Sequence, residues 1–459
     1  MDRATARPEV ATIPGERASE WVDYHQRFAA PSTYVYEFVW DAGGEAIGPF
    51  CTDVDGNVLL DFTSHVAAAP LGYNNPTIRE KLREFDLVDP LKIAGQDFYV
   101  SGGGSPDDPD FPGPTQLMDR LVAMTEDYDM DRVFLSNSGA EAVENAIKIC
   151  YAAGGHRAVT FEGGFHGRTL GALSLNRSKT VHRRGFPEIP GVVSVPYPAT
   201  DEEYDTRWRT DGPGGNVVAD ALHPERGVVD PDEVAFLILE PIQGEGGYRV
   251  AHPEFARDLE ALRERYDLRI IADEIQSGLG RTGKPWAVDH LDLTPDVITS
   301  AKGLRVGATI SRSDVFPEEK GRLSSTWGAG DLVAAMQGVL TIDTIHEENL
   351  LANVRERGEQ LRTILEDAVE DGEAPGMVDT RGRGLMLAVE FDTKERRDAV
   401  LESAFRRGLL TLGCGYKTLR LLPPLDVTKR EIELGTRLLL ESIGEAADRS
   451  RTDSNERGQ

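Results

Sequence analysis

The residues with the clearest capacity for chemistry follow short apolar runs in the middle of the chain. The run IIA ends in two adjacent carboxylates, Asp273 and Glu274, and the run DVITS leads to Lys302. A lysine can act as a nucleophile or a base once its amine is deprotonated, and a carboxylate can hold an opposing positive charge. A lone lysine after a strand is more often a surface ammonium, so a functional role for Lys302 depends on the residues that lie around it.

A turn that could bind a phosphate follows the apolar run RVFLS. The sequence NSGAEAVENAIK opens a helix after Ser138, and the exposed amide groups at a helix N-terminus attract anions. Ser138 and Glu141 also have the spacing of an S-x-x-E capping box, which would satisfy the helix end without a ligand. This stretch alone is compatible with both interpretations.

Two further runs bring charged and aromatic side chains to the same expected edge of a sheet. AVTF is followed by Phe165, His166 and Arg168, and AFLIL is followed by Glu240 and Glu245. Because ligands of parallel α/β sheets bind outside the carboxyl ends of the strands, these positions are candidates for a common site. Without a common site, a single arginine or glutamate at such an edge is expected to be solvated.

The acidic strand end also raises the possibility of a nucleotide site, because GLGRTGK at 278–284 fits the G-x4-G-K pattern of a phosphate-binding loop. Such a loop needs Ser or Thr as its next residue to hold Mg²⁺, and it follows the first strand of its fold. Position 285 is proline, and the pattern lies after the acidic strand. We therefore expect GLGRTGK to be a structural turn.

The elements that would position these residues alternate between short strands and helical stretches from about 115 to 305. The strand candidates are RVFLS (132–136), AVTF (158–161), AFLILE (235–240), RIIAD (269–273) and DVITS (296–300). This alternation predicts an α/β domain with a mostly parallel central sheet covered by helices. We expect this large domain to span 71–340.

A smaller α+β domain is expected from the two ends of the chain. The segment 1–70 contains a possible helix at 16–29 and a hairpin around Asp55-Gly56. The segment 341–448 alternates helical patterns with strand candidates at 384–391 and 418–424. The tail at 449–459 is polar throughout, which predicts disorder.

Composition narrows the class of protein. The chain has 459 residues and a formal net charge of −28, which argues against nucleic acids and anionic membranes as partners. Only ten of its 50 basic residues are lysines, and this acidic, lysine-poor mixture suits a halophilic protein in a salt-rich cytosol. Three scattered cysteines do not form a CxxC metal site and favour a reducing compartment. We expect a cytoplasmic protein without a metal, since no signal peptide or spanning apolar run is evident.

A phosphate-binding turn, a strand-end carboxylate and a strand-end lysine together meet the needs of pyridoxal 5'-phosphate (PLP). From about 53 to 427 the chain resembles the class III, omega-type (subgroup II) aminotransferases of fold type I, through the motifs SNSGAEAVENAIK, GGFHGRTLG, EPIQGEGG, IADEIQSGLGRTGK, SAKG and RGRGLM. Within that family it is similar to archaeal 4-aminobutyrate and omega-amino-acid aminotransferases and to lysine 6-aminotransferases. The resemblance implies that a terminal amino group passes to 2-oxoglutarate, giving a semialdehyde and glutamate.

The resemblance also implies how the cofactor would be held. Lys302 would bond covalently to PLP and then carry the proton between the substrate and cofactor carbons, while Asp273 would pair with the ring nitrogen. Gln276 would bind the phenolic oxygen, and Phe165 would stack on the ring. The other implied cofactor contacts are Ser138, Gly139, Ala140, His166 and, from the neighbouring subunit of a homodimer, Thr326.

Substrate contacts are implied in the same way. Arg168 would bind the carboxylate distal to the reacting carbon, and Arg420 would bind the α-carboxylate of glutamate or 2-oxoglutarate. Glu245 would neutralise Arg420 when a substrate lacks that group, and Val66 stands where ornithine-specific members carry a tyrosine. Acetylornithine or ornithine transamination, and racemase or aminomutase chemistry on the same fold, are the alternatives.

Overall fold

The computed structural model describes residues 1–85, 101–324 and 332–457, and the chain divides into two compact units. The larger unit comprises Glu80–Leu351, and the smaller unit comprises Met1–Arg79 together with Ala352–Gln459. The sequence predicts boundaries after residues 70 and 340, whereas the units divide after Arg79 and Leu351. Both ends of the chain belong to the smaller unit.

A seven-stranded sheet forms the centre of the larger unit. Its strand order is β3 (Arg132–Ser136), β11 (Gly307–Ser311), β10 (Val297–Ser300), β9 (Ile270–Asp273), β6 (Val234–Leu239), β4 (Arg157–Phe161) and β5 (Val192–Val195). Each strand runs parallel to its neighbours except β11, which pairs antiparallel with both β10 and β3. The five predicted strands are all present, so the mostly parallel α/β sheet is confirmed.

The sequence does not predict β11, and the connection that precedes this strand explains its direction. Only residues 301–306 separate β10 from β11, and this length is too short for the crossover that a parallel neighbour requires. The chain turns back through a short 3-10 segment, η6 (Lys302–Leu304), and pairs antiparallel with the strand it has just left.

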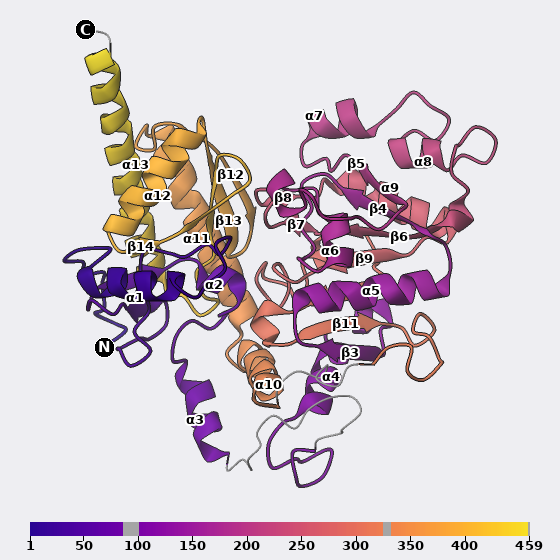
Figure 1. Ribbon diagram of the computed structural model, residues 1–459, viewed down its shortest axis with the longest axis horizontal. Coiled ribbons are helices and arrows are strands. Elements are labelled where there is room, and N and C mark those ends of the chain that lie inside the picture. The colour runs from indigo at the N-terminus through magenta and orange to yellow at the C-terminus, as the bar shows by residue number, and fades with distance from the viewer. Residues whose placement is uncertain (86–100, 325–331, 458–459) are drawn as a thin grey trace. The chain divides into compact units, whose positions relative to one another are not determined.

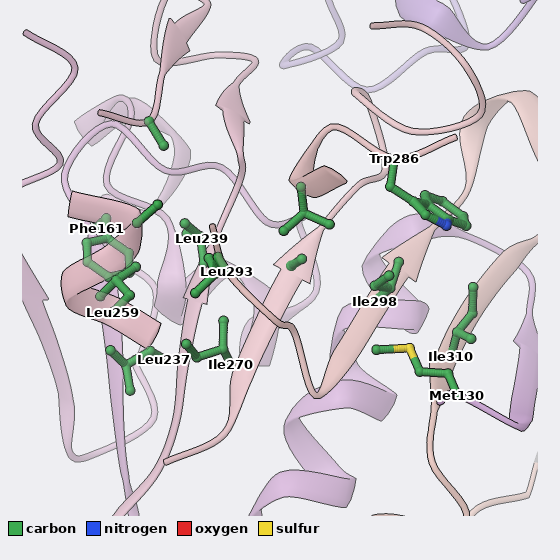
Figure 2. Packing of buried hydrophobic residues seen from close by; sticks show 14 of the residues in the cluster. Met130, Phe161, Leu237, Leu239, Leu259, Ile270, Trp286, Leu293, Ile298 and Ile310 are labelled. Carbon is green, nitrogen blue, oxygen red and sulfur yellow. The ribbon is translucent and has the colours of Figure 1, made fainter. Parts of the chain in front are cut away.

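Helices cover the sheet, and strands such as β6 are buried on both faces. The larger unit also contains the helices α4 (Pro114–Ala123), α5 (Gly139–Ala153), α6 (Leu170–Leu175), α7 (Asp201–Glu203), α8 (Val217–Ala221), α9 (Pro253–Tyr266) and α10 (Leu332–Glu347), and the hairpin of β7 (Ile242–Gln243) and β8 (Arg249–Val250). Helix α5 lies against β3, β6, β10 and β11 (Figure 1). Along β6, Leu237 and Leu239 enter one hydrophobic cluster, part of which is shown in Figure 2, while Phe236 and Ile238 enter another.

The smaller unit combines both ends of the chain in its sheets. One sheet has the order β1 (Phe50–Thr52), β2 (Val58–Asp61), β14 (Leu409–Leu410), and the other has the order β12 (Met377–Arg383), β13 (Met386–Phe391), β16 (Thr418–Leu421), β15 (Leu412–Cys414). Strands β1 and β2 form the predicted hairpin, in which Gly56 supplies a φ of +87°. Because β14 pairs with β2, the C-terminal segment completes a sheet begun by the N-terminal segment.

The smaller unit also contains helices, of which α12 and α13 contact its sheets. They are α1 (Glu16–Gln26), α2 (Ser64–Ala67), α12 (Lys394–Arg406) and α13 (Lys429–Arg457), while α3 (Pro76–Glu84) and α11 (Leu350–Glu370) contain the two boundaries between the units. Within the described ranges, no helix combines the length and the apolar character needed to cross a membrane.

The tail for which the sequence predicts disorder continues α13 as far as Arg457. The tail is polar, but it contains no proline, and its first glycine is Gly458. Extending an existing helix gains a hydrogen bond for each residue fixed, whereas starting a new helix requires an unfavourable first turn. The disorder of this tail stays a prediction.

The stretch GLGRTGK forms turns, as predicted. The side chain of Glu274 forms hydrogen bonds with residues on both sides of this stretch. The Glu274 carboxylate accepts hydrogen bonds from the Ser277 hydroxyl at 2.6 Å and from the Val288 amide at 2.7 Å. Glu274 is 1% exposed, and its burial raises its pKa to about 7. Glu274 is thus a structural acceptor that links two segments of the loop.

We expect an E274Q variant to change how stability depends on pH. The folded-state pKa lies above the ordinary value of 4.5, so the folded protein holds this proton more tightly than the unfolded chain does. The stability that the carboxyl contributes is present below pH 4.5 and is lost as the pH rises through about 7. The free energy of unfolding of E274Q relative to wild type should therefore rise by roughly 2 to 3 kcal/mol between about pH 5 and about pH 8.

Chemical denaturation at the two pH values measures this difference. E264Q, a change at an exposed position of α9, is the matched control and should show no such rise. A difference between E274Q and wild type that stays constant with pH would contradict the raised pKa of Glu274.

Candidate active site

The parallel strands β9 and β10 bring the carboxylate and the lysine together. Thr299 of β10 is in register with Asp273 of β9, and Lys302 follows three residues later in the chain. Asp273 and Lys302 both line a cavity of about 520 Å³ within the larger unit. This volume lies in the usual range for small-molecule sites, roughly 300 to 1,000 Å³.

Most of the predicted site residues line this cavity. They come from the turn before α5, the loop after β4, the β7–β8 turn and the ends of β9 and β10, and they are Ser138, Gly139, Ala140, Phe165, His166, Arg168, Glu245, Asp273, Gln276 and Lys302. Glu240, which the sequence places at the same edge of the sheet, lines the cavity as well, and so do Asn137 and Arg305, which the sequence does not assign to a site. Asn137 directly follows β3, so its position at the carboxyl edge of the sheet is the signal that could have found it, whereas Arg305 lies in the connection between β10 and β11.

Asp273 is buried among hydrogen-bond donors. Its Oδ1 accepts from the Ile275 amide and the Thr299 hydroxyl, both at 3.2 Å, and its Oδ2 lies 2.8 Å from Nδ1 of His166. Asp273 is 3% exposed and His166 is 2% exposed. An ionised carboxylate only accepts hydrogen bonds, so Nδ1 of His166 would carry the proton in a pair with ionised Asp273. The carboxylate keeps free lone pairs, with which it can bind a positively charged N–H group.

The first turn of α5 provides an anion site. Ser138 caps the helix, with its Oγ accepting from the Glu141 amide at 3.2 Å, so the capping interpretation is correct for this residue. The cap still leaves the amides of Gly139 and Ala140 at the start of the helix, where no preceding turn supplies carbonyl groups. A Cβ on Gly139 would lie 2.9 Å from the terminal methyl group of Ile275, so a larger residue here would require the Ile275 side chain to shift.

Lys302 occupies a strained backbone conformation in the short connection after β10. Its φ is +49°, in the left-handed region that non-glycine residues seldom adopt, and Arg305 has a φ of +65°. Such conformations cost on the order of 1 to 3 kcal/mol each and persist where the surrounding structure imposes them, often at functional sites. The sharp return from β10 to β11 imposes them here.

Gln276 is held by a buried tyrosine. The Tyr248 hydroxyl donates a hydrogen bond to Oε1 of Gln276 at 2.9 Å, and Tyr248 is 0% exposed. Tyr248 also has a left-handed backbone, with a φ of +55°, so the β7–β8 turn accepts strain to place this ring. With Oε1 engaged by a donor, the Nε2 group of Gln276 is oriented to donate, which suits contact with a phenolic oxygen.

Glu240 is buried rather than solvated, contrary to the expectation for a lone glutamate. It is 6% exposed and accepts hydrogen bonds from the amides of Phe165, at 2.9 Å, and Gly244, at 2.8 Å. Burial raises the pKa of Glu240 to about 7, with His166 opposing the rise and Asp273 adding to it. Through these two hydrogen bonds, the Glu240 carboxylate links the β7–β8 turn to the loop that contains Phe165.

Arg168 is an exposed cation of the cavity. Its guanidinium carbon lies 5.7 Å from the centre of the Phe165 ring, and the His182 ring packs edge-on against the same ring at 5.3 Å. Among the residues that the structure describes, Arg168 has neither a hydrogen bond nor an ion pair. A planar guanidinium in this state can bind a carboxylate through two parallel hydrogen bonds.

Glu245 forms an ion pair that the sequence does not predict. Its Oε2 lies 3.0 Å from Nζ of Lys179, which stands between α6 and the short helix η2 (Thr180–His182). The predicted partner of Glu245, Arg420, belongs to the smaller unit.

Three of the predicted site residues belong to other parts of the chain. Val66 and Arg420 belong to the smaller unit, and Thr326 lies outside the described residues. Val66 has a φ of +60° within a left-handed turn that extends from Ser64 to Ala67, and Arg420 is 6% exposed on β16. The roles assigned to these three residues stay predictions.

The cavity fits PLP. An amine at Lys302, a buried carboxylate at Asp273 and amides at the start of α5 are the groups that its aldehyde, ring nitrogen and phosphate require. Gly139 itself lines the cavity, at the helix N-terminus where backbone amides favour an anion.

Comparison with known proteins agrees with this chemistry. A family model described as aminotransferase class-III matches residues 42–443. An alanine/serine racemase of Pyrococcus horikoshii is 31% identical over 456 residues, covering 95% of this chain and 92% of the relative. An acetylornithine aminotransferase of Methanopyrus kandleri is 33% identical over 390 residues, covering 83% of this chain and 88% of the relative.

Among solved structures, a lysine aminotransferase from M. tuberculosis has a TM-score of 0.80 and 25% sequence identity, with 95% of this chain and 100% of that chain covered. The family match extends over most of the chain, and the cavity supplies the amine, carboxylate and anion site that the family's cofactor needs. The chain therefore belongs to the class-III aminotransferases, PLP-dependent transaminases of fold type I.

Proposed function

We propose that the protein transfers the terminal amino group of an omega-amino acid, such as 4-aminobutyrate or lysine, to 2-oxoglutarate. The observation that carries this proposal is Arg168, a guanidinium with neither a hydrogen bond nor an ion pair among the described residues, in the same cavity as Lys302. A donor with an amine at one end and a carboxylate at the other can engage both residues at once. Acetylornithine and lysine, after which two of the related enzymes are named, also carry a terminal amine.

The chain's own residues would divide the proton chemistry between them. PLP, when bound, supplies an electron-withdrawing ring that stabilises the charge left when a proton leaves the substrate carbon. Lys302 Nζ would take up that proton as a base, and Asp273 would hold a proton on the ring nitrogen. His166 and Thr299 fix the orientation of the Asp273 carboxylate. Gln276, with its Oε1 held by a tyrosine hydroxyl, would donate to the phenolic oxygen.

The second substrate would use a different arginine. We propose that Arg420 binds the α-carboxylate of 2-oxoglutarate, and that Glu245 neutralises Arg420 when the donor carries no such group. Val66, in place of a tyrosine, would favour donors other than ornithine. This assignment rests on the family resemblance of TLRLLPP, EPIQGEGG and the segment around Val66.

We propose a cytoplasmic homodimer in which Thr326 reaches the phosphate site of the neighbouring subunit. The three cysteines, Cys51, Cys150 and Cys414, are buried free thiols, which suits a reducing compartment. Burial raises the pKa of both Cys51 and Cys150 to about 12, so these thiols stay protonated and inert to oxidation.

Borohydride reduction of the holoenzyme should attach the cofactor irreversibly to the peptide that contains Lys302, as mass spectrometry of a digest would show. K302A should abolish the label, whereas K284A, a change in the GLGRTGK turn, should retain it. Incubation with an amine donor and no keto acid should then accumulate pyridoxamine phosphate, because a transaminase keeps the amino group. A label on another residue would refute the assignment of Lys302, and a racemized donor without pyridoxamine phosphate would indicate a racemase.

An R168Q variant should identify the substrate carboxylate. We expect kcat/KM for 4-aminobutyrate to fall by roughly 30- to 150-fold, the effect of losing about 2 to 3 kcal/mol of charge-assisted hydrogen bonding. A panel of 4-aminobutyrate, lysine, β-alanine, acetylornithine and ornithine, each with 2-oxoglutarate, would show which donors depend on Arg168. Equal loss for n-butylamine, which lacks a carboxylate, would mean that Arg168 acts in some other way.

The net charge of −28 predicts that salt stabilises the protein. Raising KCl from about 0.01 M to about 1 M shortens the screening length from roughly 30 Å to roughly 3 Å, which weakens repulsion between surface carboxylates. We expect the melting temperature to rise by more than about 5 °C, a change that scanning calorimetry resolves. A melting temperature that is independent of salt would contradict the proposed halophilic character.

A further inference from the structure

Arg305 is a second exposed arginine of the cavity, and the proposed mechanism does not use it. It lines the cavity together with Lys302 and Arg168. Within the ranges that the structure describes, the guanidinium of Arg305 has neither a hydrogen bond nor an ion pair. Such a side chain is ordinary on an open surface, but this one stands in a cavity whose cofactor carries a phosphate.

The backbone of Arg305 is strained. Its φ is +65° and its ψ is −11°, in the left-handed region, and its amide closes the turn by donating to the Lys302 carbonyl at 3.0 Å. Glycine adopts this conformation without strain, so an arginine here costs stability. No printed contact of the guanidinium with a described residue offsets that cost. The side chain therefore has a role that contacts within the described chain do not explain.

The pairing of β3 and β11 sets Arg305 beside the anion site. These strands are antiparallel, with Gly307 opposite Ser136, and both lie against α5 (Figure 1). Arg305 lies two residues before Gly307, so continuing the register sets it opposite Ser138, the cap of α5. A Cβ on Gly307 would lie 2.2 Å from the Ser138 carbonyl oxygen, so the two backbones still approach closely beyond the last paired residues.

The two arginines of the cavity belong to different parts of the sheet edge. Arg305 lies between β10 and β11, whereas Arg168 follows β4, and β9 and β6 separate β10 from β4. Neighbouring strands are about 5 Å apart, so the two arginines start from backbone positions roughly 15 to 20 Å apart across the sheet. Arg305 thus adjoins the start of α5, and Arg168 lies toward the opposite end of the cavity.

The anion site also contains a carboxylate of the protein. Oε2 of Glu141, in the first turn of α5, accepts hydrogen bonds from the Asn137 amide at 2.8 Å and from the Asn137 side chain at 3.2 Å. This carboxylate offsets part of the positive potential of the helix N-terminus. The net charge of −28 also opposes the approach of a phosphate dianion. A guanidinium beside the amides of α5 would restore the attraction.

We propose that Arg305 binds the phosphate of PLP, in addition to the amides at the start of α5. A planar guanidinium can donate two parallel hydrogen bonds to phosphate oxygens. Because Arg305 and Lys302 belong to the same short connection, one turn would hold the cofactor at both its reactive carbon and its phosphate. This role does not depend on which amino donor the enzyme uses.

Equilibrium dialysis of the holoenzyme against PLP measures this contact. R305M should raise the Kd for PLP by about 10- to 100-fold, the effect of losing charge-assisted hydrogen bonds. The Kd for pyridoxal, which lacks the phosphate, should change by less than about twofold. R305K keeps the charge and should lie between wild type and R305M. R226M, at an exposed arginine outside the cavity, is the matched control and should bind PLP as wild type does.

An R305G variant separates binding from folding. Glycine relieves the left-handed backbone, so the melting temperature of the apoenzyme should equal or exceed that of wild type, while the Kd for PLP rises as in R305M. Phosphorus NMR of bound PLP supplies a spectroscopic readout. A nearby cation favours the dianion, so the phosphate should gain its second proton at a higher pH in R305M than in wild type.

Wild-type affinity for PLP in R305M would overturn the inference. An equal loss of PLP and pyridoxal binding would also overturn it, because that result indicates a general structural effect. Unchanged PLP binding together with weaker binding of butyrate would assign Arg305 to a substrate carboxylate instead. No amino donor takes part in these measurements, so their outcome is independent of the proposed transamination.

Discussion

The site depends on the parallel pairing of β9 and β10, which sets Thr299 beside Asp273. Neighbouring strands lie about 5 Å apart, so this register alone places the carboxylate and the lysine-bearing turn at one edge of the sheet. A slip of one residue would turn the Asp273 side chain to the opposite face. The hydrophobic clusters on both faces prevent such a slip, because Ile270 and Ile271 each require a different apolar neighbourhood. The apolar core thus sets the geometry of the polar site.

Backbone strain marks the positions where that geometry is difficult to reach. Lys302, Arg305 and Tyr248 all have positive φ without being glycine. Each lies in a short reversal at the site, either between β10 and β11 or between β7 and β8. A longer loop would relieve the strain, but it would also let the lysine and the glutamine vary in position. The short connections therefore fix the geometry of the site at a cost in stability, and the packing of the buried sheet can offset that cost.

The sequence predicts the elements of the larger unit and most of its site because both depend on local signals. Apolar runs of strand length identify β3, β4, β6, β9 and β10, and the residues after them line the cavity. Features that depend on spatial partners are less accessible. The buried carboxylate of Glu240 accepts hydrogen bonds from the amides of Phe165 and Gly244, which belong to two different loops. The ion pair between Lys179 and Glu245 joins residues that are 66 positions apart in the chain. No periodicity in the sequence reports such contacts.

The charges in the cavity depend on the hydrogen-bond and ion-pair partners of its acidic side chains. Burial raises the pKa of Glu240 to about 7, although the nearby His166 and two backbone amides stabilise its ionised form. Asp273 instead meets the His166 ring, the Thr299 hydroxyl and an amide, and these donors leave it able to oppose a positive charge. Glu245 forms an ion pair with Lys179. Because these acids of the cavity have other partners, Arg168, which has neither a hydrogen bond nor an ion pair among the described residues, would be available to bind a carboxylate from solution.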